Sequence, residues 1–255
     1  MRHDGRMYAQ PGVTARADTP AAERAEPNRR LPASSFRSRH SALSDLQRDT
    51  WERRWPELGL SVGQEPSGEQ PDIAAWFGRR APLVVEIGCG NGASTLAMAQ
   101  DEPDIDVIAV EVYRRGLAQL LCAIEREQVG NVRLILGNGI DVLERLVAPG
   151  SLTGVRVFFP DPWPKVRHHK RRFVQPATVD LIADRLLPGG ILHAATDHPG
   201  YAEHIAEVGD SQARLVRVDP GAESLPISVV RPTTKYETKA QEAGSDVTEL
   251  IWKRR

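Results

Sequence analysis

The chain has 255 residues, enough for one α/β domain with tails, and its 40% hydrophobic and 26% charged residues are typical of a globular protein. Its formal net charge of −1 excludes recognition of a nucleic acid by overall charge, so such a partner would have to be met by a local basic patch. No apolar run is long enough for a membrane span or a signal peptide, so we expect a cytoplasmic protein.

Residues 1–35 are rich in Arg, Ala and Pro and contain one aromatic residue, so we predict a disordered tail there and a folded domain over 36–255. Through residue 40 the chain carries 8 Arg against 4 acidic residues, which leaves open a solvated tail or a non-specific arm for RNA phosphates. A helix is predicted over 45–55, where Ser44 and Gln47 fit a capping box. Residues 61–72 are interpreted as a loop.

From residue 83 onward, apolar strand patterns alternate with helical ones. The helix over 113–128 is predicted to end at a Gly130-Asn131 cap, and the helix over 177–187 to begin at Pro176 and end at residues 188–190. This alternation predicts a doubly wound, mostly parallel seven-stranded sheet of the α/β class with an antiparallel edge hairpin. Strands are predicted over 83–87, 107–110, 132–136, 155–159, 191–195, 213–218 and 247–252, and further helices over 94–100, 140–147 and 201–208.

The first of these strands ends in a glycine turn that is typical of nucleotide binding. Gly88, Gly90 and Ala93 also satisfy the dinucleotide fingerprint, so an NAD site has to be considered. Glu86 favours S-adenosylmethionine instead, because a carboxylate inside the strand can hold the cationic end of a methionine moiety. Glu111 closes the next strand, where an acid accepts both ribose hydroxyls of either cofactor.

Asn138 follows the third strand of the pattern, beside the expected adenine pocket. Its side-chain oxygen could accept a hydrogen bond from the adenine amino group. It could equally cap the next helix. Both interpretations stay open at this point.

The fourth strand leads into the proline-rich segment PDPWPK (160–165), at the strand end where open α/β sheets bind ligands. Five permanent positive charges without an acid follow between residues 165 and 172, and we predict that they contact RNA phosphates, a solvated face being the alternative. His168, His169 and the two cysteines, Cys89 and Cys122, do not have metal-ligand spacing, so no metal site is predicted. The charged residues are Lys165, Arg167, Lys170, Arg171 and Arg172.

Taken together, these motifs resemble the bacterial tRNA (guanine-N7-)-methyltransferase family. The strongest marks are PDPWPK (160–165) with the basic residues behind it and RPTTKYE (231–237), followed by TDH (196–198) and the less specific EIGCGNG (86–92). The resemblance runs from about Ser35 to the C-terminus. It implies a Rossmann-like class I fold, S-adenosyl-L-methionine as cofactor, and tRNA as the partner, methylated at N7 of a variable-loop guanine.

The resemblance also implies roles for individual residues. Asp161 matches the position proposed as catalytic, and we hypothesise that it orients the guanine through the base N1–H and amino group. Many members have Asp where this chain has Asn138, which weakens the expected adenine contact without removing it. Cofactor-binding positions are Glu86, Glu111, Asn138 and Asp161, with Gly88 and Gly90 from the turn, and substrate-binding positions are Lys165, Asp197, Thr234, Lys235, Tyr236 and Glu237.

Three rival interpretations explain less of the sequence. A NAD-dependent oxidoreductase is not supported, because the sequence has no Tyr-x-x-x-Lys motif or comparable catalytic set. A small-molecule methyltransferase would not need the basic run, and a non-catalytic RNA-binding module would leave Glu86, the glycine turn and Glu111 unexplained. We therefore expect a tRNA-modifying enzyme with no membrane and no obligatory protein partner.

Overall fold

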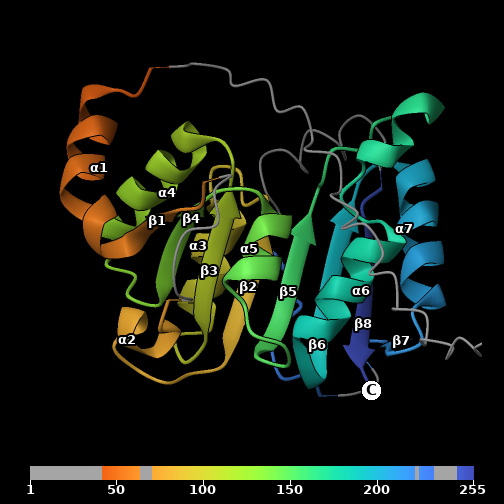
Figure 1. Ribbon diagram of the computed structural model, residues 1–255. Coiled ribbons are helices and arrows are strands. Elements are labelled where there is room, and N and C mark those ends of the chain that lie inside the picture. The colour runs from red at the N-terminus through yellow and green to blue at the C-terminus, as the bar shows by residue number, and fades with distance from the viewer. Residues whose placement is uncertain (1–41, 64–70, 222–223, 233–245) are drawn as a thin grey trace, which may run out of the picture. The chain divides into compact units, whose positions relative to one another are not determined.

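A computed structural model describes residues 42–63, 71–221, 224–232 and 246–255, and these residues form an eight-stranded sheet (Figure 1). The strand order is β1-β4-β3-β2-β5-β6-β8-β7, with neighbours parallel from β1 to β6 and antiparallel on both sides of β8. The predicted doubly wound α/β class with an antiparallel edge pair is confirmed. The strands are β1 Gly59–Ser61, β2 Leu83–Ile87, β3 Asp106–Glu111, β4 Val132–Leu136, β5 Leu152–Phe158, β6 Leu186–Thr196, β7 Leu215–Arg217 and β8 Thr248–Arg254.

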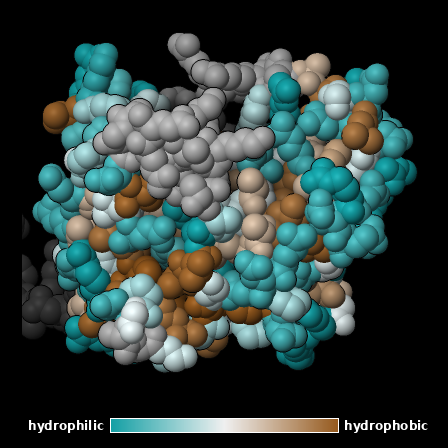
Figure 2. Space-filling view, turned by 180° about the vertical axis from the view of Figure 1, so that it is seen from behind, coloured by the Kyte–Doolittle hydropathy of each residue, from teal (hydrophilic) through white to brown (hydrophobic). Residues whose placement is uncertain are grey.

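Helices cover both faces of the sheet because alternate strand residues point to opposite sides. Val85 and Ile87 pack with α5, α6 and α7, and α5 and α6 lie in front of the strands in Figure 1. Val84 packs on the other face with α1, α3 and α4, and Figure 2 shows the molecule from behind, where hydrophilic residues surround an apolar region. The helices are α1 Asp45–Leu58, α2 Ile73–Phe77, α3 Ala93–Asp101, α4 Arg114–Glu127, α5 Gly139–Arg145, α6 Pro176–Arg185 and α7 Pro199–Ser211, with a 3-10 helix η1 over Val166–Arg171.

The prediction of seven strands was wrong, because β1 makes an eighth in the described part of the chain. β1 pairs in parallel with β4, Gly59 beside Leu134 and Ser61 beside Leu136. A three-residue strand has no apolar alternation to detect, and only the exposed edge of β4 makes it a strand. The short helix α2 was missed for a similar reason, since five residues give little periodicity.

Two helices end differently from the predictions. α4 is capped by Gln128 in the left-handed region (φ 55°) and not by Gly130-Asn131, because the Asn131 side chain is buried and donates to Ala99 O and Ile105 O. α6 ends at Arg185, and the predicted stop at 188–190 lies inside β6, opposite an irregularity between Leu152 and Gly154. The capping box at Ser44 and the helix start at Pro176 are confirmed.

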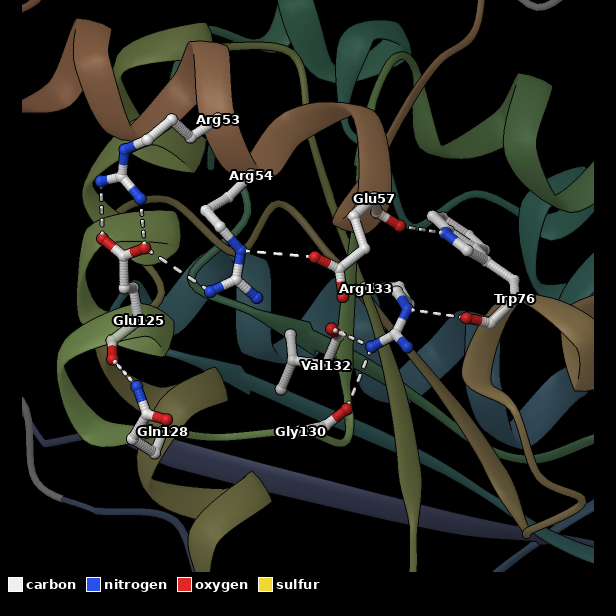
Figure 3. Close-up of polar contacts among 9 residues, drawn as sticks. All are labelled: Arg53, Arg54, Glu57, Trp76, Glu125, Gln128, Gly130, Val132 and Arg133. Atoms are coloured by element: carbon white, nitrogen blue, oxygen red, sulfur yellow. Dashed lines mark hydrogen bonds and ion pairs between the residues drawn. The ribbon is translucent and has the colours of Figure 1, made fainter.

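The helix α1 is held at the edge of the sheet by polar contacts (Figure 3). Arg53 donates from both terminal nitrogens to the carboxylate of Glu125 on α4, at 2.8 and 3.1 Å. The indole of Trp76 on α2 donates to Glu57 O at 3.0 Å, which joins α1 to α2. Since exposed ion pairs contribute little, burial of the apolar side chains of Trp51 and Leu58 supplies most of the attachment of α1.

The predicted tail over 1–35 lies outside the described residues. All described residues belong to one compact unit of the chain, and none of its described helices is both long and apolar enough to cross a bilayer.

Candidate active site

The glycine turn between β2 and α3 leaves open space at its surface. Gly88 and Gly90 have φ values of 76° and 59°, which disfavour residues with a Cβ. A Cβ built on either glycine would have no described atom within 4 Å. The turn is held from below, since Gly88 N and Cys89 N donate to Val110 O. A ligand can therefore approach the backbone of this turn closely.

Glu86 lies directly before the turn and is 2% exposed. Its Oε2 atom has no hydrogen-bond partner among the described residues. Burial raises the pKa of this carboxyl group, and the positive charge of Arg156 opposes the rise. An unsatisfied buried acceptor costs free energy unless a donor fills its place. The unpaired carboxylate oxygen of Glu86 is therefore an acceptor that fits the cationic amino end of S-adenosylmethionine.

Glu111 ends β3 beside the same turn. Its carboxylate accepts from Gly90 N at 2.9 Å, from Val112 N at 2.8 Å and from Tyr113 N at 3.0 Å. Burial raises the pKa of Glu111, and these hydrogen bonds lower it. Three of about four acceptor positions are thus occupied, so a contact with both ribose hydroxyls requires the Gly90 bond to be shared or to open.

Asn138 caps α5, because its side-chain oxygen accepts from Ile140 N at 2.9 Å. Of the two interpretations left open by the sequence, the cap is present in the structure. One lone pair of the oxygen remains for a second donor. The cap and the predicted adenine contact are therefore compatible.

The loop that carries Asp161 begins and ends in strained backbone. Phe159 and Trp163 have φ values of 48° and 43°, and such conformations cost about 1–3 kcal/mol each for residues other than glycine. Asp161 is exposed, and its negative charge contributes to the raised pKa of Glu111. The loop follows β5, and β5 and β3 both pair in parallel with β2, so the loop lies at the same carboxyl edge of the sheet as the cofactor turn and Glu111.

Most of the basic run lies in η1, and its side chains differ in how far they are exposed. Lys165, Arg167 and Lys170 are exposed, whereas Arg171 is half-buried with its guanidinium 5.0 Å from the ring centre of Trp163. Partial burial and the surrounding positive charges lower the pKa of His168. The four cations around His168 thus concentrate positive charge on this surface, and an anion such as an RNA phosphate would offset their repulsion.

Arg172 does not share this surface, being only 5% exposed. Its Nε donates to Pro162 O at 2.8 Å, and its guanidinium lies 4.7 Å from the ring centre of Tyr201. The predicted contact of Arg172 with RNA phosphates does not fit this burial. Arg172 instead ties the proline-rich loop to α7.

The remaining predicted positions are only partly described. Asp197 is half-buried at the end of β6, and the next residue, His198, caps α7 by accepting from Tyr201 N at 3.2 Å. Thr234, Lys235, Tyr236 and Glu237 lie outside the described residues. Within the ranges that the structure covers, no group of three or more His, Cys, Asp or Glu side chains could hold a metal ion.

Beneath the site, Glu86 belongs to a row of buried polar residues whose other two members were missed by the sequence analysis. Glu86, Arg156 and His193 are direct neighbours in register on β2, β5 and β6, at 2%, 0% and 0% exposure. Arg156 donates to Glu102 Oε2 at 2.6 Å, and His193 lies 2.7 Å from Glu249 on β8. The detectable signal was a polar residue at the centre of an apolar strand, both at 156 and at 193.

A cavity of about 380 Å³ lies elsewhere, between α2, α5 and the sheet. Its lining includes Leu83 and Asp106, the first residues of β2 and β3. It therefore opens at the amino ends of the strands, opposite the glycine turn and Asp161, and it is not part of the candidate active site.

Comparison with known proteins agrees with this geometry. Residues 80–250 match a family model described as a putative methyltransferase. A relative from Mycobacterium avium (strain 104), named tRNA (guanine-N(7)-)-methyltransferase, is 69% identical over 100% of both chains. Relatives of the same name from Mycobacterium tuberculosis (strain CDC 1551 / Oshkosh) and Mycobacterium ulcerans (strain Agy99) are 66% and 64% identical, covering all of this chain and 96% and 99% of theirs.

Among solved structures, the 16S rRNA methyltransferase KamB is 17% identical with a TM-score of 0.49, over 76% of this chain and 98% of that chain.

Proposed function

Because the chain belongs to the tRNA (guanine-N(7)-)-methyltransferase family, we propose that it methylates N7 of a guanine in tRNA, in the variable loop. The methyl donor is S-adenosylmethionine. The observation that carries the proposal is that the glycine turn with Glu86, the Glu111 carboxylate and the Asp161 loop follow three adjacent parallel strands and so lie at one edge of the sheet. Ligands of open α/β sheets bind at this edge.

Each residue of the cofactor site binds a different part of S-adenosylmethionine. Glu86 holds the amino end, the amides at Gly88 and Gly90 approach the ligand closely, Glu111 accepts from the ribose, and Asn138 accepts from the adenine amino group. S-adenosylmethionine supplies a methyl group on a sulfonium, which is already activated for transfer.

The chain's own residues then have a positioning and electrostatic task. Guanine N7 carries a lone pair and no proton, so in-line transfer needs no general base. Asp161 accepts from the guanine N1–H and amino group, which fixes N7 at the methyl group. The product base gains a positive charge, so the nearby carboxylates of Asp161 and Glu111 stabilise the developing charge.

The tRNA is held by the exposed part of the basic run. Lys165, Arg167 and Lys170 contact backbone phosphates, and Asp197 contacts the base; residues 234–237 share the substrate-binding role by their match to the family motif. Phosphate contacts position the RNA without specifying sequence, so the choice of guanine depends on the shape of the tRNA around the pocket.

The function is tested by incubating the full-length protein with an unmodified tRNA transcript and methyl-labelled S-adenosylmethionine. Borohydride–aniline cleavage, which breaks RNA at N7-methylguanosine, then maps the product. Cleavage at one variable-loop guanine is expected. Label incorporated without cleavage would keep the methyltransferase and reject N7, and absence of label with intact cofactor binding would reject tRNA as the acceptor.

The orienting role of Asp161 gives a first prediction. Asp161→Asn is expected to keep cofactor affinity within about twofold and to lower turnover about 100-fold, the usual effect of losing one preorganised electrostatic contact. Calorimetry measures the first quantity, and single-turnover kinetics the second. Asp104→Asn, on an exposed turn at the opposite end of the sheet, is the control. Loss of cofactor binding with turnover per bound complex intact would contradict this role.

A further inference from the structure

Arg231 lies against the base of the Asp161 loop, although it is far from that loop in sequence. Its side chain is 2% exposed and donates to Glu249 Oε1 on β8 at 3.0 Å. Its guanidinium lies 5.4 Å from the ring centre of Phe158 and 4.9 Å from that of Phe159. One buried cation thus contacts the last residue of β5 and the first residue of the loop.

The turn at Phe159 is the place where such a contact has most effect. Phe159 adopts a positive φ of 48°, a conformation that persists only when its surroundings hold it. Its N–H donates to Ala195 O at 2.8 Å, which fixes the backbone from the side of β6. The guanidinium of Arg231 holds the ring of the same residue by a cation–π contact. Asp161 follows only two residues later.

Arg231 is itself held by the sheet. The second carboxylate oxygen of Glu249 lies 2.7 Å from His193 Nε2, so Glu249 is fixed between two partners. His193 is fully buried and packs its ring edge-on against Phe158, with centroids 4.9 Å apart. β6 and β8 therefore define the position of the guanidinium, and a planar, stacked guanidinium transmits that position to the turn.

We propose that Arg231 is a positioning residue for methyl transfer: held by Glu249 and His193, it keeps the strained turn at Phe159 in place and so sets the position of Asp161. This inference rests on the proposed function, because Asp161 matters only if it orients the base. It assigns no contact with substrate or cofactor to Arg231. Its effect is on kcat, since a displacement of about 1 Å in a catalytic group can lower the rate about 100-fold.

The chain offers a matched control in Arg217 on β7. Arg217 donates to both oxygens of Asp210, at 3.0 and 2.7 Å, and its guanidinium lies 5.4 Å from the ring centre of Trp252. It therefore makes the same two kinds of contact at the edge of the sheet, remote from Asp161. Its side chain is 43% exposed, so Arg217→Gln controls for the loss of an ion pair and a cation–π contact, not for the loss of a buried side chain.

The test uses the full-length protein labelled with 5-fluorotryptophan and the variants Arg231→Gln and Arg217→Gln. The five tryptophan resonances are assigned by single Trp→Phe replacements. Arg231→Gln is expected to shift or broaden the 19F resonance of Trp163, at the far end of the Asp161 loop, and to leave that of Trp252 unchanged. Arg217→Gln is expected to do the reverse.

Kinetics on the same samples complete the test. Arg231→Gln is expected to lower kcat between about tenfold and 100-fold with the cofactor Kd within twofold of wild type, and Arg231→Lys to restore only part of the rate. Arg217→Gln is expected to keep wild-type kcat. If Arg231→Gln does not fold, Glu249→Gln takes its place, with the same direction of change in kcat and in the Trp163 resonance.

Two results would overturn the inference: an unchanged Trp163 resonance, or a kcat within twofold of wild type, in the variant that folds. Equal losses of kcat in Arg231→Gln and Arg217→Gln would also overturn it, since they would indicate a general loss of structure. Failure of the proposed function is distinguishable, because the wild-type protein would then form no N7-methylguanosine. The 19F spectra would still report whether Arg231 holds the loop.

Discussion

The buried carboxyl group of Glu86 destabilises the protein when no ligand is bound. Glu86 is 2% exposed with an oxygen that finds no donor in the described residues, and burial raises its pKa. An acid whose pKa is raised on folding contributes stability below its ordinary value of 4.5, and this contribution is lost as pH rises through the raised pKa. Above that raised pKa the ionised group therefore costs stability, which binding of a cation offsets.

Glu86→Gln is accordingly expected to separate stability from binding. The variant should unfold at a temperature a few degrees higher at pH 8, as about 1 kcal/mol shifts Tm by 2–4 °C in a domain of this size. The difference should shrink as pH falls through the raised pKa towards 4.5, because folded wild-type Glu86 takes up its proton over this range. Scanning calorimetry over a pH series checks both statements.

The same variant is expected to bind S-adenosylmethionine at least about tenfold more weakly, since a charge-assisted hydrogen bond contributes about 1.5–3 kcal/mol. Titration calorimetry measures the affinity, with Glu203→Gln on the exposed face of α7 as the control. An unchanged cofactor Kd, or a lower Tm at pH 8, would refute the role given to Glu86.

Between elements, the contact of α4 with the glycine turn determines the form of the cofactor site. A Cβ on Gly116, in the first turn of α4, would lie 2.1 Å from Gly90 O. The Glu111 carboxylate bonds both Gly90 N and Tyr113 N, and so joins the turn to the start of the same helix. The turn, β3 and α4 are therefore joined by direct contacts.

Gly116→Ala is expected to push α4 away from the turn. Overpacking of this kind costs about 1–3 kcal/mol of stability, and the displaced Gly90 should weaken cofactor binding by at least about tenfold. Denaturant unfolding and titration calorimetry measure the two effects. Gly130→Ala is the control, because a Cβ there meets no described atom within 4 Å. Equal effects of the two variants would contradict the close contact.

Across the whole molecule, charge is distributed so that a nearly neutral protein presents a cationic rim. The formal net charge is −1, while the exposed side chains of Lys165, Arg167 and Lys170 stand together at the carboxyl edge of the sheet. Binding of tRNA should therefore depend on salt through a small number of phosphate contacts.

Arg167→Ala and Lys170→Ala are each expected to lower the slope of log Kobs against log[salt] for tRNA by about 1. Fluorescence anisotropy at several salt concentrations gives the slope. Arg126→Ala, exposed near the end of α4, should leave it unchanged, and Arg172→Ala should lower stability with little change in slope. If Arg126→Ala changed the slope as much as Arg167→Ala, the hypothesis that tRNA binds at this local cationic surface would be refuted.

The sequence by itself determined the features that depend on neighbours along the chain. The apolar strand runs, the Ser44 capping box, Pro176 at a helix start and the glycine turn after Glu86 each lie within one short window. The motif at 160–165 could be recognised as a site because proline, aspartate and lysine follow a strand directly. These patterns were enough for the fold class and for most of the candidate site.

Only the tertiary structure decided which distant residues meet. β1 is a strand because β4 offers an open edge, and Arg172 is buried because α7 brings Tyr201 beneath it. Glu86, Arg156 and His193 form one row only because β2, β5 and β6 are adjacent, which strand order fixes and local pattern does not. Burial and pairing are properties of neighbours in space, and the contact of Arg231 with Phe159 joins residues 72 positions apart in the chain.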